Sequence, residues 1–454
     1  MEINPFIFRE YDIRGVVEKD FPDDVVEILG KAFGTYVQRK GVDKISLGGD
    51  VRLTTKQLKK AFTKGVISTG VNVVDIGIIP TPVSYFSIFR LNLKGAVQIT
   101  GSHNPPEFNG FKMTLSTGAV YGEGIMAIKK IIDDDDFDSG EGTVEEADIT
   151  EDYRRDIIGK IKLKKKIKII TDCGNGAGGL VAPEVLRAIG CEVDELFTEP
   201  DGTFPNHHPD PTIEKYITKL IETVKNGNYD FGVAFDGDMD RIGVVDNKGE
   251  IVWADYLMAL FSEEILSKGN RTIIFDVKCS QALPERIEEL GGTPLMYRTG
   301  HSLIKEKLRE LDEGFAGEMS GHIFFGDEHY GYDDALYVTA RLARFMSERE
   351  ESLSEMMAKL PKYYATPEMR LNTKDDKAKF EIAQKAVEYF TKNYECTTID
   401  GVRIMFGDGW GLVRASNTQP VIVVRFEAKS QERLEEIKAE VIGKLQEFGE
   451  IELD

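Results

Sequence analysis

Three aspartates between two apolar segments form the pattern with the clearest chemistry. In FGVAFDGDMDRIGVV, Asp236, Asp238 and Asp240 alternate with other residues. Extended backbone points such positions to one side, so we expect the three carboxylates to converge. Converging carboxylates repel one another unless a cation lies among them, and oxygen ligands alone select a hard ion such as Mg²⁺. An EF-hand is excluded, because its sixth and twelfth positions would be Arg241 and Asn247.

A serine follows a second apolar segment, in AVQITGSHNPPEFNGFK. The asparagine and two prolines after His103 disfavour a helix, which predicts an exposed and rigid turn at Ser102. Gly101 would let backbone amides approach phosphate oxygens closely. Lys112 could bring a cation to the same place. A polar loop at the end of a strand is the alternative, but the density of unusual residues favours a site that handles phosphate.

Two further segments carry groups that could bind a phosphorylated sugar. The sugar segment, GFAGEMSGHIFFG, places a carboxylate, a hydroxyl and an imidazole at alternate positions: Glu318, Ser320 and His322. Each sugar hydroxyl both donates and accepts, so such a set can hold neighbouring hydroxyls, although a structural histidine is the alternative. The phosphate segment, WGLVRASNTQPVIVVRFEA, contains four side chains that can donate to phosphate oxygens, with a polar hairpin turn as the alternative. These residues are Arg414, Ser416, Asn417 and Thr418.

Arg14 in EYDIRG and His301 in YRTGHSLIK complete the cationic candidates, with an ion pair and a helix N-terminus as their structural alternatives. The run GNGAGG, residues 174–179, satisfies the dinucleotide pattern G-x-G-x-x-G after an apolar strand. An acidic residue should then end the next strand, but none stands clearly there before Glu199. The run therefore indicates dinucleotide binding only weakly.

Composition narrows the partners and the compartment. The 454 residues include 78 acidic and 57 basic side chains, a formal net charge of -21 that repels nucleic acid and anionic membranes. We therefore expect neither as a partner, and an anionic substrate must meet cations concentrated in a cleft. The chain has four cysteines without a CxxC pair, no secretory signal pattern and no apolar run of about 18 residues. These features predict a cytoplasmic protein.

Short apolar strands alternate with amphipathic helices through most of the chain, which is typical of layered α/β domains. The acidic, glycine-containing run at 133–148 predicts a solvated face or linker. Together these patterns predict three α/β domains and a small C-terminal α+β domain. The domains cover residues 1–148 with the serine, 149–250 with the three aspartates, 251–362 with the sugar segment and 363–454 with the phosphate segment.

Taken together, YDIRG, TGSHNPPEFNGFK, DGDMDR, GEMSGH and RASNTQP resemble the signature set of the α-D-phosphohexomutase superfamily. The set is most similar to that of the phosphomannomutase/phosphoglucomutase branch, and it covers the whole chain. The resemblance implies three related mixed-sheet α/β domains and a fourth domain of TATA-box-binding-protein-like fold around a central cleft. It implies interconversion of hexose 1-phosphate and hexose 6-phosphate, of mannose, glucose or both, through a phosphoserine and a sugar 1,6-bisphosphate that also acts as activator.

The resemblance also implies a role for each matching residue. Ser102 bears the phosphoryl group, and together with it Asp236, Asp238 and Asp240 hold Mg²⁺. Five residues match the catalytic centre, with the lysine and the second histidine as candidate proton handlers: Arg14, His103, Lys112, Arg241 and His301. Seven residues match the substrate site: Glu318, Ser320, His322, Arg414, Ser416, Asn417 and Thr418.

Several alternatives stay open on the residues alone. A phosphoglucosamine mutase would carry similar motifs. A phosphatase or mutase of haloacid-dehalogenase type would use Asp236 as the nucleophile and leave the Ser102 loop unexplained. A dehydrogenase would be built on GNGAGG, and a phosphosugar-binding regulatory protein would not need a nucleophile and a metal loop together. The preferred sugar and the choice between a monomer and a homo-oligomer are also open.

Overall fold

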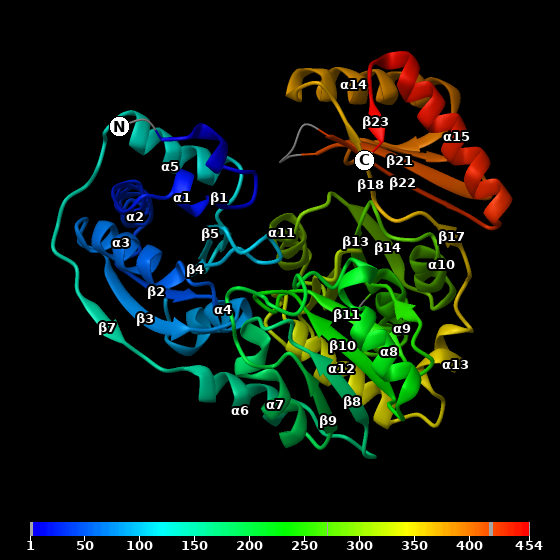
Figure 1. Ribbon diagram of the computed structural model, residues 1–454, viewed down its shortest axis with the longest axis horizontal. Coiled ribbons are helices and arrows are strands. Elements are labelled where there is room, and N and C mark those ends of the chain that lie inside the picture. The colour runs from blue at the N-terminus through cyan, green and yellow to red at the C-terminus, as the bar shows by residue number, and fades with distance from the viewer. Residues whose placement is uncertain (1–2, 270, 417–420, 454) are drawn as a thin grey trace. The chain divides into compact units, whose positions relative to one another are not determined.

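The computed structural model describes residues 3–269, 271–416 and 421–453 (Figure 1). The chain forms two compact units, each built from three separate segments. The first unit consists of Met1–Ala254, Leu308–Gly314 and Ser320–Ala358. The second unit consists of Asp255–Lys307, Phe315–Met319 and Lys359–Asp454. Among the described residues, no helix has both the length and the hydrophobicity needed to cross a bilayer.

The first sheet of the first unit has the strand order β1-β5-β4-β2-β3-β7, with β6 paired to β5. Its strands are β1 (Ile13–Val16), β2 (Lys44–Gly49), β3 (Asn72–Ile78), β4 (Gly95–Ile99), β5 (Phe108–Leu115), β6 (Gly118–Ala119) and β7 (Val144–Glu146). The sheet is mixed, because β2 runs parallel to β3 and β4 whereas β5 runs antiparallel to β1 and β4. Its helices are α1 (Val17–Asp20), α2 (Asp23–Gln38), α3 (Thr55–Ile67), α4 (Thr81–Arg90) and α5 (Glu123–Asp133).

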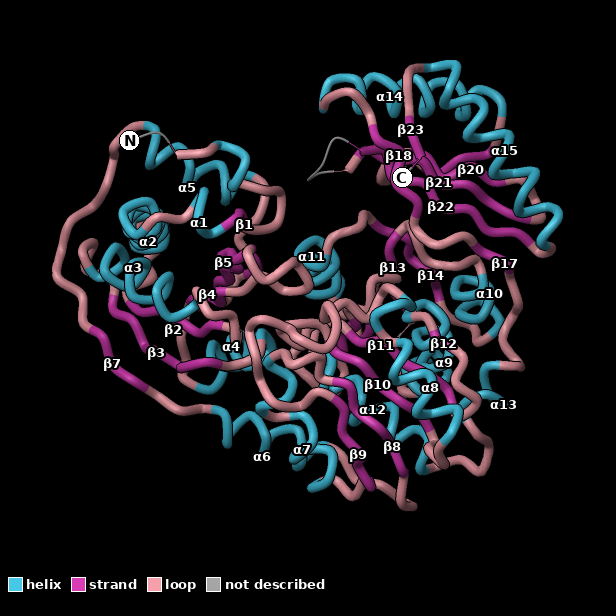
Figure 2. Tube along the Cα trace, in the orientation of Figure 1, coloured by secondary structure: helices cyan, strands magenta, loops and turns pink. Residues whose placement is uncertain are grey.

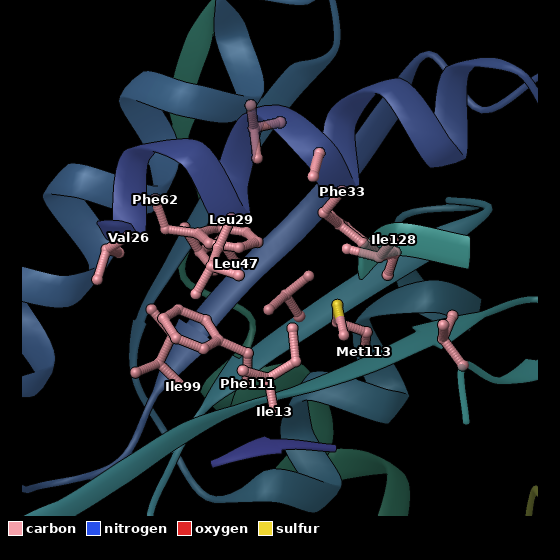
Figure 3. Packing of buried hydrophobic residues seen from close by; sticks show 14 of the residues in the cluster. Ile13, Val26, Leu29, Phe33, Leu47, Phe62, Ile99, Phe111, Met113 and Ile128 are labelled. Carbon is pink, nitrogen blue, oxygen red and sulfur yellow. The ribbon is translucent and has the colours of Figure 1, made fainter. Parts of the chain in front are cut away.

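The core of this sheet lies under α2, α3 and α5 (Figure 3). Buried apolar residues recur three or four positions apart along α2, at Val26, Leu29 and Phe33, which gives that helix one apolar face. That face meets Phe62 of α3 and Phe111 of β5, whose rings stack with centroids 4.9 Å apart. The packed layer fixes the carboxyl ends of β2 and β4, where polar residues begin.

The second sheet of the first unit has the order β12-β11-β10-β8-β9. Its strands are β8 (Lys168–Asp172), β9 (Glu192–Leu196), β10 (Phe231–Phe235), β11 (Ile242–Asp246) and β12 (Ile251–Val252). Strands β8, β9 and β10 are parallel, and β10 pairs with β11 as an antiparallel hairpin. The remaining helices and the remaining strand of this unit are α6 (Thr150–Lys160), α7 (Ala182–Ala188), α8 (Thr218–Asn226), α12 (Ala335–Ser347), α13 (Leu353–Met357) and β16 (Ile323–Phe325).

The strands of the second unit form a parallel group and an antiparallel sheet. Figure 2 shows these strands in magenta. In the parallel group, β13 (Thr272–Asp276) lies between β14 (Thr293–Tyr297) and β15 (Phe315–Gly317). Helices α9 (Ala254–Ser267), α10 (Ala282–Glu289) and α11 (His301–Leu311) belong to the same stretch of chain.

The antiparallel sheet has the order β19-β20-β21-β22-β18-β23, with β17 paired to β22. Its strands are β17 (Tyr364–Ala365), β18 (Met369–Asn372), β19 (Glu395–Thr397), β20 (Val402–Met405), β21 (Gly409–Ala415), β22 (Val421–Ala428) and β23 (Glu452–Leu453). Helices α14 (Asp376–Asn393) and α15 (Gln431–Phe448) share one buried core with this sheet. Buried residues of α15 recur at Leu434, Ile437, Val441 and Leu445, the spacing of one helical face.

Residues 133–148, predicted to be a solvated face or linker, are largely exposed, but part of the stretch is a strand rather than a linker. Val144–Glu146 form β7, which pairs in parallel with β3 at the edge of the first sheet, although its side chains are exposed as expected. The division into four domains at residues 148, 250 and 362 stays a prediction, since the compact units follow other boundaries.

Candidate active site

The three aspartates lie in the loop between β10 and β11, and all three are fully buried. Ligand atoms of Asp236, Asp238 and Asp240 lie within 4.8 Å of one another, so the expected convergence is present. The expected cause is wrong, because the loop is a turn rather than extended backbone. Met239 has a φ of 63°, which bends the chain so that the carboxylates meet.

Hydrogen bonds occupy some of the carboxylate oxygens in this cluster and leave others for a cation. Asp238 Oδ2 accepts from Thr81 Oγ1 at 2.5 Å, from Thr100 Oγ1 at 3.1 Å and from Lys112 Nζ at 2.8 Å. Lys112 Nζ also donates to Asp240 Oδ2 at 2.5 Å. The Oδ1 atoms of Asp238 and Asp240 are buried and have no hydrogen-bond partner among the described residues. Buried carboxylate oxygens without donors fit a hard metal ion.

Electrostatics at the cluster agree with this arrangement. Burial, and then the charges of Asp238 and Asp240, raise the pKa of Asp236 well above its ordinary value. Burial acts to lower the pKa of Lys112, but Asp238 and Asp240 outweigh it and the pKa is raised. Lys112 is therefore an ammonium that partly neutralises the cluster, and the uncompensated negative charge suits a divalent cation.

Ser102 lies directly beside this cluster. Its Oγ donates to Asp236 Oδ2 at 2.9 Å and lies 3.2 Å from His103 Nδ1. Ser102 has a φ of 48° and is only 2% exposed, so the expected turn exists but the expectation that it is exposed is wrong. The residue is covered because Gly237 packs against it: a Cβ at Gly237 would lie 2.5 Å from the Ser102 carbonyl oxygen.

Three cationic or basic side chains surround the serine within the first unit. Arg14 Nη1 donates to the carbonyl oxygen of Gly101 at 3.2 Å, and its Nη2 pairs with Asp12 at 2.5 Å. Burial, and then the charges of Arg241 and Arg14, lower the pKa of His103 well below its ordinary value, which favours a neutral ring. The structure thus brings together the predicted residues Ser102, Arg14, His103, Lys112 and Arg241.

His322 lies beside the loop that carries the three aspartates, residues 236–241 (the predicted metal loop), and its ring nitrogens face protein groups. Its Nδ1 is 2.9 Å from Asp333 Oδ2 and 3.7 Å from Asp240 Oδ1, and its Nε2 accepts from Arg241 Nε at 3.0 Å. Both ring nitrogens therefore face partners within the first unit. The predicted sugar-binding role of His322 stays a prediction, but the geometry places it as a support of Arg241.

The expected alternation along the sugar segment is wrong, because residues 318–322 form a turn between β15 and β16, with Gly321 at a φ of 95°. Glu318 belongs to the second unit, where its Oε1 accepts from the Gly300 amide at 2.6 Å. Ser320 and His322 belong to the first unit. His301 begins α11 and belongs to the second unit.

The described part of the phosphate segment lies in the second unit: Arg414 is in β21, and Ser416 directly follows that strand. Arg414 Nε donates to Asp400 Oδ2 at 3.1 Å, and the carbonyl oxygen of Ser416 accepts from Lys379 Nζ at 2.7 Å. The predicted residues Asn417 and Thr418 lie outside the described residues.

Four polar residues of the site were not predicted: Asp50, Arg52, Thr81 and Thr100. Asp50 and Arg52 follow β2 in GGDVR, and Thr81 begins α4 after Pro80. Thr100 follows β4 and donates to both Asp50 and Asp238. The usable signal is their position after apolar strands, which is where α/β sheets gather functional groups.

The run GNGAGG packs against the metal loop. Ala177 N donates to the carbonyl oxygen of Gly237 at 2.9 Å, and a Cβ at Gly176 would lie 2.8 Å from that oxygen. The run continues into a 3-10 helix, Ala177–Leu180, and then into the seven-residue α7. The glycines are therefore explained by close approach of two loops, which removes the reason to infer a dinucleotide.

Gly176→Ala is expected to lower the free energy of unfolding by about 1–3 kcal/mol. Gly176 has a φ of -84°, which alanine can adopt, so the cost comes from the close approach of the added Cβ to the backbone of Gly237 and Cys173. Gly159→Ala is the control: it lies in α6 with nothing within 4 Å of the added Cβ and should stabilise by about 0.5–1 kcal/mol. Urea unfolding of both variants measures the difference. Equal effects of the two substitutions would contradict the packing argument.

A half-buried histidine pair near the same loops makes stability depend on pH. His207 Nε2 lies 2.9 Å from Asp172 Oδ1, and its Nδ1 lies 2.9 Å from the carbonyl oxygen of His208. Both ring nitrogens face acceptors, which suits the doubly protonated imidazolium. Burial opposes this charge, but Asp172 outweighs burial and raises the pKa of His207 above its ordinary 6.5.

We therefore expect the stabilisation from His207 to be complete below about pH 6.5 and to be lost as the pH rises through the higher pKa of the folded protein. Thermal unfolding should show the Tm advantage of the wild type over His207→Gln shrinking as the pH rises above about 6.5. His208→Gln is the control of opposite sign, because burial lowers the pKa of His208. A Tm advantage over His207→Gln that does not change with pH would contradict the assignment.

Comparison with known proteins identifies the family of this chain. Sequence profiles of the phosphoglucomutase/phosphomannomutase family match in four parts: alpha/beta/alpha domains I, II and III at residues 5–139, 151–249 and 253–364, and the C-terminal domain at 368–444. The phosphomannomutase/phosphoglucomutase of Pseudomonas putida is 45% identical over 436 residues, which are 95% of this chain and 94% of the relative. The phosphoglucomutase of Neisseria meningitidis serogroup A is 42% identical over 439 residues, 95% of each chain.

Solved structures agree with the sequence comparison. A crystal structure of a phosphoglucomutase/phosphomannomutase family protein from Burkholderia thailandensis is 41% identical and superposes with a TM-score of 0.93, covering 99% of this chain and 100% of that one. The predicted resemblance is thereby confirmed, and so is the predicted fold class of three α/β domains and a C-terminal α+β domain. The chain belongs to the phosphoglucomutase/phosphomannomutase family, whose members are phosphohexomutases and therefore isomerases.

Proposed function

We propose that the protein interconverts the 1-phosphates and 6-phosphates of mannose, glucose or both through a phosphoserine at Ser102. A sugar 1,6-bisphosphate is the proposed intermediate and also the activator that phosphorylates Ser102. The observation that carries the proposal is the 2.9 Å separation of Ser102 Oγ and Asp236 Oδ2 within a cluster of three buried carboxylates. The mutase names of the curated relatives support the reaction class.

Mg²⁺ is the proposed metal, with Asp236, Asp238, Asp240 and phosphorylated Ser102 as its ligands. The two Oδ1 atoms that lack donors among the described residues support a cation with oxygen ligands. When bound, Mg²⁺ would neutralise charge on the phosphoryl oxygens.

The transfer has two balanced half-reactions. First, a sugar hydroxyl oxygen bonds to the phosphorus carried by Ser102 while the bond from that phosphorus to Ser102 Oγ breaks. The sugar hydroxyl gives its proton to a general base and Ser102 Oγ regains a proton, so the products are a sugar 1,6-bisphosphate and free Ser102. The bisphosphate then turns around and returns its other phosphoryl group to Ser102 Oγ, with the proton transfers reversed. The enzyme ends phosphorylated, as it began.

The cations near Ser102 have a matching role in this scheme. Phosphoryl transfer passes through a loose transition state in which charge collects on the oxygens of the transferred group. Arg14, Lys112 and Arg241 are the proposed neutralisers of that charge. Lys112 and His301 are proposed to transfer protons, as the family resemblance implies. His103 is proposed as a further catalytic residue.

The substrate-binding roles that the family resemblance implies are part of the proposal. Arg414 and Ser416, together with Asn417 and Thr418, would bind the non-reacting phosphate. The sugar hydroxyls would be read by Glu318, Ser320 and His322. Since the bisphosphate reacts in two orientations, these groups must accept either end of the sugar. Water must be kept out meanwhile, or phosphoserine hydrolysis would compete with transfer.

A coupled assay tests the function directly. Glucose 1-phosphate, mannose 1-phosphate and glucosamine 1-phosphate are each supplied with Mg²⁺ and catalytic glucose 1,6-bisphosphate. We expect turnover of the first two sugars to exceed that of glucosamine 1-phosphate. No turnover with any of the three would overturn the proposed function, and a preference for glucosamine 1-phosphate would replace it with phosphoglucosamine mutase activity.

A labelling experiment tests the nucleophile separately. The enzyme is incubated with glucose 1,6-bisphosphate that carries radiolabelled phosphate, denatured and treated with hydroxylamine. A phosphoserine survives this treatment, whereas an aspartyl phosphate does not. We expect stable label on the peptide that contains Ser102. Label lost to hydroxylamine would transfer the role of nucleophile to an aspartate such as Asp236.

A further inference from the structure

One arginine outside the predicted site binds most of the backbone around Ser102. Arg52 lies two residues after Asp50 at the end of β2, and its side chain has no exposed surface. Its Nη2 donates to the carbonyl oxygens of Ser102 at 2.8 Å and Asn104 at 2.6 Å. Its Nη1 donates to the carbonyl oxygens of Pro105 at 2.5 Å and Phe108 at 3.1 Å. The serine loop, residues 101–108, is therefore bound at four carbonyls by a single side chain.

Every N–H group of the Arg52 guanidinium has a hydrogen-bond acceptor. Nε donates to Asp50 Oδ2 at 3.1 Å, so with the four loop carbonyls its five N–H groups have five acceptors. An ammonium offers three donors from one point and cannot reach the same five acceptors. The flat fork of donors is what matches the curved path of the loop.

Asp50 binds the donors of the same stretch while Arg52 binds the acceptors. Asp50 Oδ2 accepts from Thr100 Oγ1 at 2.9 Å and from the Gly101 amide at 3.1 Å. Asp50 Oδ1 accepts from the Arg52 amide at 3.0 Å and from Thr55 Oγ1 at 2.8 Å. The pair thus fixes the backbone from the end of β4 to the start of β5.

Packing around the pair leaves little freedom for another arrangement. A Cβ at Gly101 would lie 2.4 Å from the Arg52 guanidinium carbon, so only glycine lets the guanidinium lie this close to the loop. The other side of the guanidinium lies over the Phe204 ring, 5.0 Å from its centroid. Ser102 meanwhile holds a φ of 48°, a conformation that a serine adopts only when its surroundings impose it.

We propose that Arg52 is a positioning residue that holds the serine loop in the form from which Ser102 exchanges its phosphoryl group. The proposal rests on the proposed function of Ser102. Arg52 acts through the backbone: by binding the carbonyls on one side of the loop, it keeps Ser102 Oγ turned to Asp236 and the metal loop. Loss of that orientation should slow phosphoryl transfer without changing how the sugar phosphate is bound, because reacting groups displaced by about 1 Å can cost about 100-fold in rate.

Arg52→Lys tests the proposal, with Arg341→Lys as a matched control. Arg341 is also in the first unit, has no exposed side-chain surface, pairs with Asp327 and lies over a phenylalanine ring, that of Phe325 at 4.5 Å. We expect Arg52→Lys to lower kcat at least about 100-fold with KM changed by less than about threefold. Arg341→Lys should keep kcat within about threefold at any temperature where circular dichroism shows both variants folded.

A second variant keeps the proposal testable if Arg52→Lys does not fold. Gly101→Ala retains the guanidinium and every charge, but its methyl group must displace the guanidinium from the loop. It should lower kcat at least about tenfold with KM unchanged, and wild-type kcat in this variant would overturn the proposal. Equal kcat in folded Arg52→Lys and Arg341→Lys would overturn it as well.

The labelling experiment on the wild type separates this proposal from the proposed function. Stable phosphate on Ser102 of the wild type, with unimpaired kcat in Arg52→Lys, would refute only the role of Arg52. Label on another residue of the wild type would refute the role of Ser102, and with it the reason for the positioning. In Arg52→Lys we expect Ser102 to become labelled at least about 100-fold more slowly than in the wild type, whereas Arg341→Lys should be labelled at the wild-type rate within about threefold.

Discussion

Ser102→Ala is expected to abolish interconversion of hexose phosphates, with kcat lowered by at least about 10⁴-fold, because the variant has no oxygen to carry the phosphoryl group. Binding of the sugar phosphate should change by less than about tenfold, or about 1.4 kcal/mol. The hydroxyl of Ser102 faces Asp236 in the structure, so its loss removes none of the proposed substrate-binding side chains. Coupled assays give kcat, and calorimetric titration gives the affinity.

Ser46→Ala is the control for Ser102→Ala. Ser46 is also fully buried in the first unit, where its Oγ lies 2.5 Å from Ser87 Oγ. This variant should keep kcat within about threefold, whatever it costs in stability. Turnover of Ser102→Ala near the wild-type rate would remove Ser102 from the mechanism, and equal loss of activity in both variants would show that folding rather than chemistry is affected.

Asp240→Asn is expected to have the second largest effect. It keeps the shape of the side chain but removes one of three charges that are proposed to hold Mg²⁺, and kcat should fall about 10²–10³-fold. The concentration of Mg²⁺ that gives half-maximal rate should rise at least about tenfold.

The control for Asp240→Asn is Asp246→Asn. Asp246 ends β11 and accepts from the amides of Lys248 and Glu250, in the turn that follows the strand. It should change stability without changing the dependence of the rate on Mg²⁺. The metal assignment would fail if Asp240→Asn had the same half-maximal Mg²⁺ concentration as the wild type.

Sequence reasoning could predict the proposed reactive groups because each lies within one short segment of unusual composition. Ser102 follows an apolar strand in a stretch too rich in proline and glycine for a helix, and the aspartates separate two apolar strands. Lys112 lies on β5 directly after the serine loop, so antiparallel pairing with β4 returns it to the same place. Local pattern and sheet pairing suffice for such residues.

The other features of the candidate site depend on tertiary contacts that no local sequence pattern indicates. Arg52 binds carbonyl oxygens, which every residue has, so nothing in the residues 101–108 identifies their partner. Ser102 is buried because Gly237 and Arg52 close over its backbone, and neither is near it in sequence. The turn at Met239 was missed because an Asp-x-Asp-x-Asp pattern fits an extended strand equally well. His322 pairs with Asp333 and Arg241 through contacts that alternation cannot predict.

The interrupted course of the chain through the two compact units has a consequence for biosynthesis. The first unit needs residues up to Ala358, and the second needs both Asp255–Lys307 and the segment from Lys359 onward. Neither unit is one continuous stretch of the chain. Neither is therefore complete when the ribosome has translated only the middle of the message. Within residues 255–307, β13 can pair with β14 early, but the second unit is completed only when the last 96 residues, Lys359–Asp454, have been made. A premature stop codon near residue 360 would thus yield a nascent product in which the second unit cannot form, rather than a shortened but otherwise native enzyme.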